Sequence, residues 1–283
     1  MNIMKNLKSR LLILTFMVSG FMYSQHTSFE VNISGKGNPI LLFPGFSCPG
    51  SVWDDVVTEL SKTNECHVFT FAGFGAVPAI ETPWLPKIKE EIITYISDNN
   101  LKQITLIGHS LGGTLSLWLG TENTLDLKTI ITVDALPSIG ALMMPNFDSK
   151  TIVYDNPYNK QLLDMSDENF EAMATQMASG MVINESKKEI IKDWIVETDR
   201  ETYVYGYTDL LKLDLRTDIS KITTPLVVLA AVMPYGLETV KKTYQEQYKH
   251  HGHYKIKFAE ESAHFIMYDQ PQWLLEAIKM ELN

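Results

Sequence analysis

The sequence predicts an α/β protein with an open, mostly parallel β-sheet, helices on both faces of that sheet, and a helical insertion. Two observations predict the sheet. Short, nearly continuous aliphatic runs alternate with longer segments of helical periodicity, and the first four runs end at glycine, proline or aspartate. The third observation is a stretch of helical patterns alone, from residue 138 to 215. A chain of 283 residues is long enough for one large domain with such an insertion.

Six apolar runs are predicted to be strands. Because these runs are nearly continuous in β-branched or aliphatic residues, they suit strands that helices cover on both sides. Right-handed crossover connections between them then build a mostly parallel sheet. The runs cover residues 40–43, 67–71, 104–107, 129–133, 226–232 and 254–258.

Helices are predicted where apolar residues recur at helical spacing between these strands, over residues 52–60, 84–96, 237–248 and 273–282. We assign residues 25–137 and 216–283 to an α/β core. Residues 138–215 are assigned to a cap over the carboxyl edge of the sheet. The cap has helical patterns over residues 167–180, 187–198 and 201–211.

Six of the thirteen methionines lie in the predicted cap. Methionine fills irregular gaps in protein cores, and it also makes an adaptable apolar wall for an acyl or aromatic substrate. The sequence leaves both roles open. The six are Met143, Met144, Met165, Met173, Met177 and Met181.

The first residues have the layout of a secretory signal peptide. Three basic residues precede an apolar run over residues 11–23, and small and polar residues follow it. We expect cleavage near Ser24, so that residues 1–24 are removed and the mature protein is periplasmic or secreted. The apolar run is short for a membrane span. The alternative is an uncleaved N-terminal anchor.

The charge balance excludes some classes of partner. The net charge is −10, and it becomes −13 without residues 1–24, which carry three basic residues and no acidic ones. No basic stripe is present that would neutralise phosphates. The sequence therefore argues against nucleic acid and anionic membrane surfaces as partners, and we expect no stable membrane insertion after signal removal. It gives no oligomeric state.

The two cysteines, Cys48 and Cys66, are predicted to lie in a loop and at the start of a strand. Export permits a disulfide between them. Two cysteines in a chain of this length are not a disulfide framework, and the sequence leaves the pairing open.

The strongest functional signal is a G-x-S-x-G pattern around Ser110, directly after a predicted strand and before a helical run. A serine at a sharp strand-to-helix turn, a nucleophile elbow, is strained and projects its hydroxyl above the sheet. Flanking glycines are needed because the strand and helix backbones crowd the turn. The amides at the start of the helix favour negative charge that develops nearby. We predict that Ser110 is a nucleophile.

From these motifs the chain resembles the α/β-hydrolase superfamily, in its serine-nucleophile branch, from residue 35 to the end. Residues 41–46 look like the strand and oxyanion loop of that superfamily, with Trp53 in the next helix, and residues 71–75 look like its glycine-rich loop. The resemblance implies a parallel sheet with a helical cap. Haloalkane dehalogenases and epoxide hydrolases have an aspartate where this chain has Ser110.

The resemblance also implies an oxyanion hole formed by the backbone N–H groups of Phe46 and Leu111. Where the superfamily usually has His-Gly, this chain has Pro44-Gly45. That departure leaves the donor intact, because the hole uses the amide of the next residue. Losing one such donor typically costs about 3 kcal/mol of transition-state stabilisation.

His264 is the predicted general base. It follows the last predicted strand and precedes Phe265, in the loop where the superfamily places its catalytic histidine, and it comes last in the chain order. A histidine can take the serine proton and return it to the leaving group at neutral pH. The other candidates are His109, His250, His251 and His253.

The triad acid is the least regular position. Most members of the superfamily have it in the loop after the strand that is predicted here over residues 226–232, but Pro234 stands about where an aspartate is expected. Asp134, at the end of the preceding strand, is the candidate that we choose, since some members place the acid there. It would orient His264 and stabilise its imidazolium. The alternatives are Glu238, Asp209 and Asp214.

Together these residues predict acyl transfer to water through an acyl-enzyme, on an apolar small-molecule acyl substrate, with a carboxylic ester as the first choice. A C–C bond, lactone or amide hydrolase would use the same triad. The alternative from another class is a binding protein that keeps the fold without the chemistry. We expect no cofactor and no metal, because the histidines near residue 250 lack a carboxylate or cysteine at supporting spacing.

Overall fold

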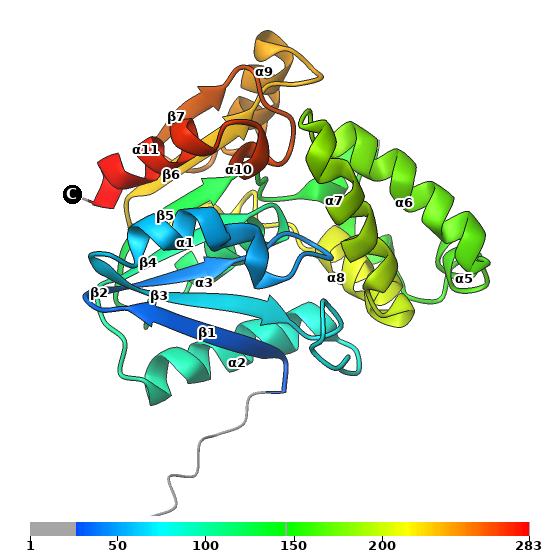
Figure 1. Cartoon of the computed structure of the whole chain (residues 1–283), viewed down its shortest axis with the longest axis horizontal. Coiled ribbons are helices and arrows are strands. Elements are labelled where there is room, and N and C mark those ends of the chain that lie inside the picture. The colour runs from blue at the N-terminus through cyan, green and yellow to red at the C-terminus, as the bar shows by residue number, and fades with distance from the viewer. Residues whose placement is uncertain (1–26, 145, 283) are drawn as a thin grey trace, which may run out of the picture.

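A computed structural model describes residues 27–144 and 146–282 (Figure 1). The predicted signal peptide lies outside the described residues. The sheet has seven strands in the order β1-β3-β2-β4-β5-β6-β7. All neighbouring pairs are parallel except β1 and β3, which are antiparallel. This arrangement confirms the predicted fold class.

Six strands agree with the predicted runs to within three residues at each end. They are β2 (Asn38–Phe43), β3 (Asn64–Phe71), β4 (Ile104–His109), β5 (Leu127–Val133), β6 (Leu226–Ala231) and β7 (Tyr254–Ala259).

The edge strand β1 (Phe29–Gly35) was not predicted. It pairs with β3 on one side only, and most of its residues are exposed, so it has no continuous apolar run. Its signal is the alternation of Phe29, Val31 and Ile33 with polar residues, which is typical of a half-buried strand.

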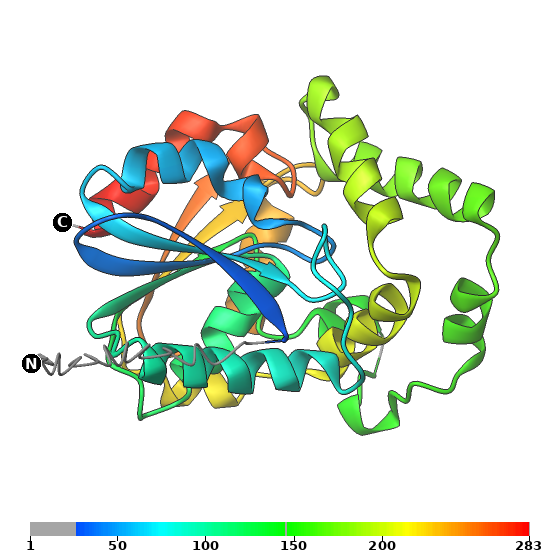
Figure 2. The same cartoon turned by 60° about the horizontal axis from the view of Figure 1, so that its bottom comes forward.

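Helices cover both faces of the sheet. Successive side chains of β2 point to opposite faces, so that Ile40 and Leu42 join one core and Leu41 and Phe43 the other. The first core includes residues of α1 (Asp54–Leu60) and α11 (Pro271–Leu282). The second includes residues of α2 (Trp84–Asp98), α3 (Leu111–Gly120) and α9 (Leu237–Gln247). Figure 2 shows α1 and α11 on one side of the strands and α2 on the other.

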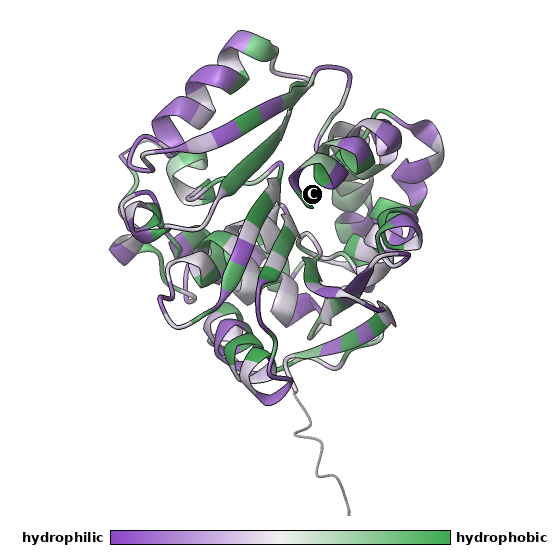
Figure 3. Ribbon diagram, turned by 90° about the vertical axis from the view of Figure 1, so that its left-hand side faces the viewer, coloured by the Kyte–Doolittle hydropathy of each residue, from purple (hydrophilic) through white to green (hydrophobic). Residues whose placement is uncertain are grey.

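Apolar residues gather in the central strands, and hydrophilic residues lie on the outer helices (Figure 3). Both cysteines are buried free thiols, so the disulfide that the sequence left open is not formed. Burial raises the pKa of Cys66 to about 11, which keeps its thiol protonated.

The described residues between β5 and β6 form helices and no strand. They stand beyond the carboxyl ends of the parallel strands (Figure 1). The predicted helix over residues 201–211 is a π-helical turn, Thr202–Gly206, that continues as α8. The α-helices of this region are α4 (Ile139–Met143), α5 (Pro157–Leu163), α6 (Asp167–Met181), α7 (Glu185–Glu197) and α8 (Tyr207–Lys212).

Candidate active site

Ser110 lies at the turn between β4 and α3 with φ 52° and ψ −117°. This is a strained backbone conformation for a residue with a side chain, and strain of this kind is common at functional sites. The helix begins at the next residue, Leu111. The structure thus gives Ser110 the strand–turn–helix geometry of a nucleophile elbow.

The glycines around Ser110 are required by close backbone contacts. A Cβ atom on Gly108 would lie 2.1 Å from the carbonyl oxygen of Gly112. A Cβ atom on Gly112 would lie 2.4 Å from the carbonyl oxygen of Phe43, at the end of β2. The turn can therefore form only if both positions have no side chain.

The loop after β2 is fixed against the start of α3. The backbone N–H of Gly112 donates to the carbonyl of Pro44 at 3.1 Å. Leu111 is the first residue of α3, so its N–H group has no acceptor within the helix. The two predicted oxyanion donors, on Phe46 and Leu111, belong to residues that line the same cavity as Ser110.

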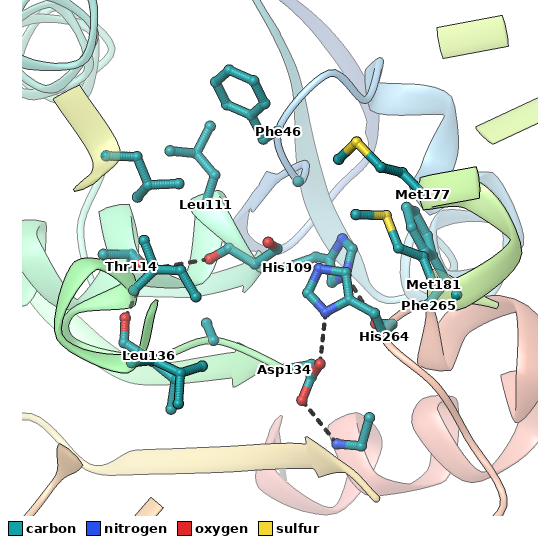
Figure 4. A pocket seen from close by; sticks show the side chains of 18 of the residues that line it. Phe46, His109, Leu111, Thr114, Asp134, Leu136, Met177, Met181, His264 and Phe265 are labelled. Carbon is teal, nitrogen blue, oxygen red and sulfur yellow. Dashed lines mark hydrogen bonds and ion pairs between the residues drawn. The ribbon is translucent and has the colours of Figure 1, made fainter. Parts of the chain in front are cut away.

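His264 and Asp134 meet across 130 residues of chain. His264 lies between β7 and α10 (Ile266–Asp269), and its Nδ1 is 2.6 Å from Oδ2 of Asp134, at the end of β5 (Figure 4). Both side chains are partly buried, at 29% and 18% exposure. This contact brings together the base and the acid that the sequence predicts.

The second oxygen of Asp134 is also occupied. Its Oδ1 accepts hydrogen bonds from the backbone N–H of Ala231 at 3.0 Å and from the hydroxyl of Tyr244 at 2.9 Å. Ala231 ends β6, the strand after which the acid of the superfamily usually stands. A carboxylate at the end of β5 is thus held by the backbone of that neighbouring strand. Burial and the adjacent carboxylate raise the pKa of Tyr244 well above its usual value, so the hydroxyl remains a donor.

The three alternative acids are engaged elsewhere. Glu238 is exposed and pairs with Lys241 at 2.9 Å. Asp214 pairs with Arg216 at 2.7 Å. The buried Asp209 accepts hydrogen bonds at 2.7 and 3.1 Å from two backbone N–H groups at the start of α2, where it satisfies the helix terminus.

His109 has a structural contact that the sequence did not reveal. It is fully buried, and its Nε2 lies 3.0 Å from the carbonyl oxygen of His264, to which it donates. The two imidazole rings are 4.6 Å apart. Burial, together with the nearby His264, lowers the pKa of His109 well below its usual value. A neutral His109 therefore ties the loop that carries His264 to the elbow.

Ser110, His264 and Asp134 border a cavity of about 650 Å³ (Figure 4). Its wall includes Met177 and Met181 of α6 and aromatic residues, some of them from the helical region between β5 and β6. Among the described residues that line it, no lysine or arginine occurs, and Asp134 is the one carboxylate. The cavity suits an apolar, uncharged ligand.

The methionines of the helical region differ in whether they line the cavity. Met143, Met177 and Met181 line the cavity. Met165 and Met173 do not line it, and both pack against the first hydrophobic core, as Met177 and Met181 also do.

In the part of the chain that the structure describes, no group of three or more His, Cys, Asp or Glu side chains is arranged to hold a metal ion. None of the helices described is both long enough and apolar enough to cross a membrane.

Comparisons with known proteins agree with the fold. A model of the alpha/beta hydrolase family matches residues 40–277, and the chain belongs to this family. The pimeloyl-[acyl-carrier protein] methyl ester esterase of Aeromonas hydrophila is 25% identical to it over 204 residues, which are 70% of this chain and 78% of that esterase.

Two solved structures share the fold. The enol-lactonase of Burkholderia xenovorans has a TM-score of 0.75 at 16% identity and covers 90% of this chain and 96% of its own. A thermophilic esterase of Thermogutta terrifontis has a TM-score of 0.70 at 18% identity, over 90% of this chain and 92% of its own. At these identities the likeness concerns the fold alone.

Proposed function

We propose that this protein is a serine hydrolase that cleaves a carboxylic ester, with Ser110 as nucleophile, His264 as general base and Asp134 as the acid of the triad. The observation that carries the proposal is the 2.6 Å contact between His264 and Asp134 in a cavity that also contains the strained Ser110. Each of the three comes from the carboxyl end of a different strand, or from the loop that follows it.

In the proposed reaction, the Ser110 hydroxyl attacks the ester carbonyl while His264 takes its proton. Because Nδ1 of His264 faces Asp134, Nε2 is the nitrogen left for proton transfer. The backbone N–H groups of Phe46 and Leu111 stabilise the negative oxygen of the tetrahedral intermediate. The imidazolium then protonates the departing alcohol, which leaves an acyl-enzyme that water hydrolyses by the same steps.

The ester substrate is proposed to be small, apolar and uncharged inside the cavity. The described residues of the lining include no cationic side chain to pair with a carboxylate, and burying such a charge without a partner is costly. The curated relative is a methyl ester esterase by name, which favours an ester over an amide or a C–C bond.

Hydrolysis of p-nitrophenyl esters of increasing acyl length, with a Ser110→Ala variant alongside, tests this function. We expect activity that disappears in the variant, and a chain-length optimum set by the cavity. If folded protein hydrolyses no ester in the series, the ester proposal is wrong. A lactone, amide or C–C bond substrate, or a binding protein without chemistry, would then be the alternative.

We further propose that the protein is exported, on the strength of the basic and apolar composition of residues 1–24. Fractionation of producing cells, with N-terminal sequencing of the protein, tests this. Export predicts a mature N-terminus near residue 25 outside the cytoplasm. An intact Met1 in the cytoplasmic fraction would contradict it.

A further inference from the structure

Two tyrosines of the cavity wall come from the helical region between β5 and β6. They are Tyr203, in the π-helical turn, and Tyr207, at the start of α8. Their rings pack edge-on against Phe46, at centroid distances of 5.7 and 5.3 Å. The backbone N–H of Phe46 is one of the two proposed oxyanion donors, so the two tyrosines stand close to the reacting end of the cavity.

The contacts that the structure gives these hydroxyls are weak. The Tyr203 hydroxyl donates to Sδ of Met177 at 3.4 Å, and the Tyr207 hydroxyl donates to Sδ of Met143 at 3.3 Å. A thioether sulfur is a poor acceptor. Both methionines line the cavity too, so the hydroxyls lie at its wall. Each hydroxyl would gain by exchanging sulfur for an oxygen acceptor.

The protonation state of the tyrosines fits a donor role. Burial and the neighbouring tyrosine hydroxyls raise the pKa of Tyr203 above its usual value, and burial raises that of Tyr207. Both hydroxyls therefore keep their protons at neutral pH. Because the cavity lining within residues 27–144 and 146–282 has no cationic side chain, a neutral carbonyl oxygen suits them better than a carboxylate.

We propose that Tyr203 and Tyr207 form a polar subsite that binds a second carbonyl oxygen of the substrate, such as that of a ketone or a second ester. The substrate class is then an ester with a neutral acceptor oxygen away from the scissile bond. This proposal rests on the ester hydrolase function proposed above.

The test compares methyl esters of straight-chain acids with methyl esters of the same length that carry one ketone, placed at successive positions along the acyl chain. For each pair, the ratio of kcat/KM for keto ester to that for plain ester is measured in the wild type and in Tyr203→Phe/Tyr207→Phe. Dividing the two ratios cancels the difference in hydrophobicity between the esters. Tyr205→Phe is the matched control, because Tyr205 lies on the same helical segment but does not line this cavity.

We expect the wild-type ratio to exceed that of the double variant by about tenfold at one ketone position, since in the double variant the buried ketone oxygen loses both hydroxyl donors. The ratio in Tyr205→Phe should equal that of the wild type. A quotient within about twofold of one at every position would overturn the subsite.

The same comparison can be made with dissociation constants of the esters, measured in a Ser110→Ala background, and it then does not depend on turnover. If no ester is hydrolysed but the binding quotient is about tenfold, the hydrolase proposal fails while the subsite stands. If esters are hydrolysed and both quotients stay near one, the subsite fails while the hydrolase proposal stands.

Discussion

Replacing Asp134 with asparagine should abolish most activity while leaving the fold intact. Asparagine has the shape of aspartate, and its amide oxygen can still accept from the N–H of Ala231 and the hydroxyl of Tyr244. Its amide nitrogen, however, would face Nδ1 of His264, where the carboxylate Oδ2 lies now. An N–H donor at that place favours the tautomer with its proton on Nε2, which cannot accept the proton of Ser110.

This reasoning sets the size of the effect. A triad with the wrong histidine tautomer and no carboxylate loses about 10⁴-fold in kcat, which corresponds to about 5.5 kcal/mol of transition-state stabilisation. The two remaining hydrogen bonds keep the change in the free energy of unfolding to about 1 kcal/mol.

The assay is steady-state hydrolysis of a p-nitrophenyl ester by Asp134→Asn, with urea unfolding as the check on the fold. Glu238→Gln is the matched control, because Glu238 is an exposed carboxylate paired with Lys241, and its loss should leave kcat unchanged. The reasoning is refuted if folded Asp134→Asn keeps kcat within tenfold of the wild type, or if the large loss occurs in Glu238→Gln instead.

Three further variants test other parts of the structure. Gly112→Ala places a methyl group 2.4 Å from a backbone oxygen and should destabilise the protein by about 2 kcal/mol or more in thermal unfolding. Gly252→Ala, whose added methyl group would have no atom within 4 Å, should change the stability little. Equal melting temperatures of the two variants would contradict this. His109→Gln keeps an N–H donor and removes a buried imidazole whose pKa is lowered. As the pH falls below about 6.5, the free energy of unfolding, measured with urea, should therefore fall more steeply in the wild type than in the variant, by up to about 1.4 kcal/mol per pH unit. Parallel curves would count against a neutral His109. Tyr244→Phe removes a donor to the proposed acid, which makes the carboxylate a stronger partner of the imidazolium, so the acidic limb of the pH profile of kcat/KM should move to higher pH. Tyr248→Phe should leave that limb in place, because the Tyr248 hydroxyl donates to a backbone carbonyl instead. Identical shifts in the two variants would indicate an effect of packing.

The elements that the sequence predicted well are those with a local signal. The strands β2 and β4 are buried on both faces, so their apolar runs are nearly continuous. β3 begins three residues before its predicted start, because its first residues, Asn64 and Glu65, are polar yet pair with β2. The edge strand β1 was not predicted, because a strand that pairs with one neighbour and is buried on one face shows only an alternating pattern of apolar and polar residues.

In the candidate site, too, the features with a local sequence signal were predicted and the long-range contacts were not. The turn at Ser110 is encoded within seven residues, and the structure gives it the predicted geometry. The partners of Asp134 are not local: Ala231 and Tyr244 lie 97 and 110 residues further along the chain. The contact between His109 and the carbonyl of His264 spans 155 residues. No pattern in one sequence reports such pairs, because they depend on how the strands are ordered in the sheet.

The most direct test of the proposed mechanism is labelling with a fluorophosphonate, which reacts with an activated serine, followed by mass spectrometry of the peptides. The proposed triad predicts one adduct on Ser110 in the wild type, and little or none in a folded His264→Ala variant. An adduct on another serine, or none in folded protein that hydrolyses esters, would contradict the assignment of Ser110 as the nucleophile.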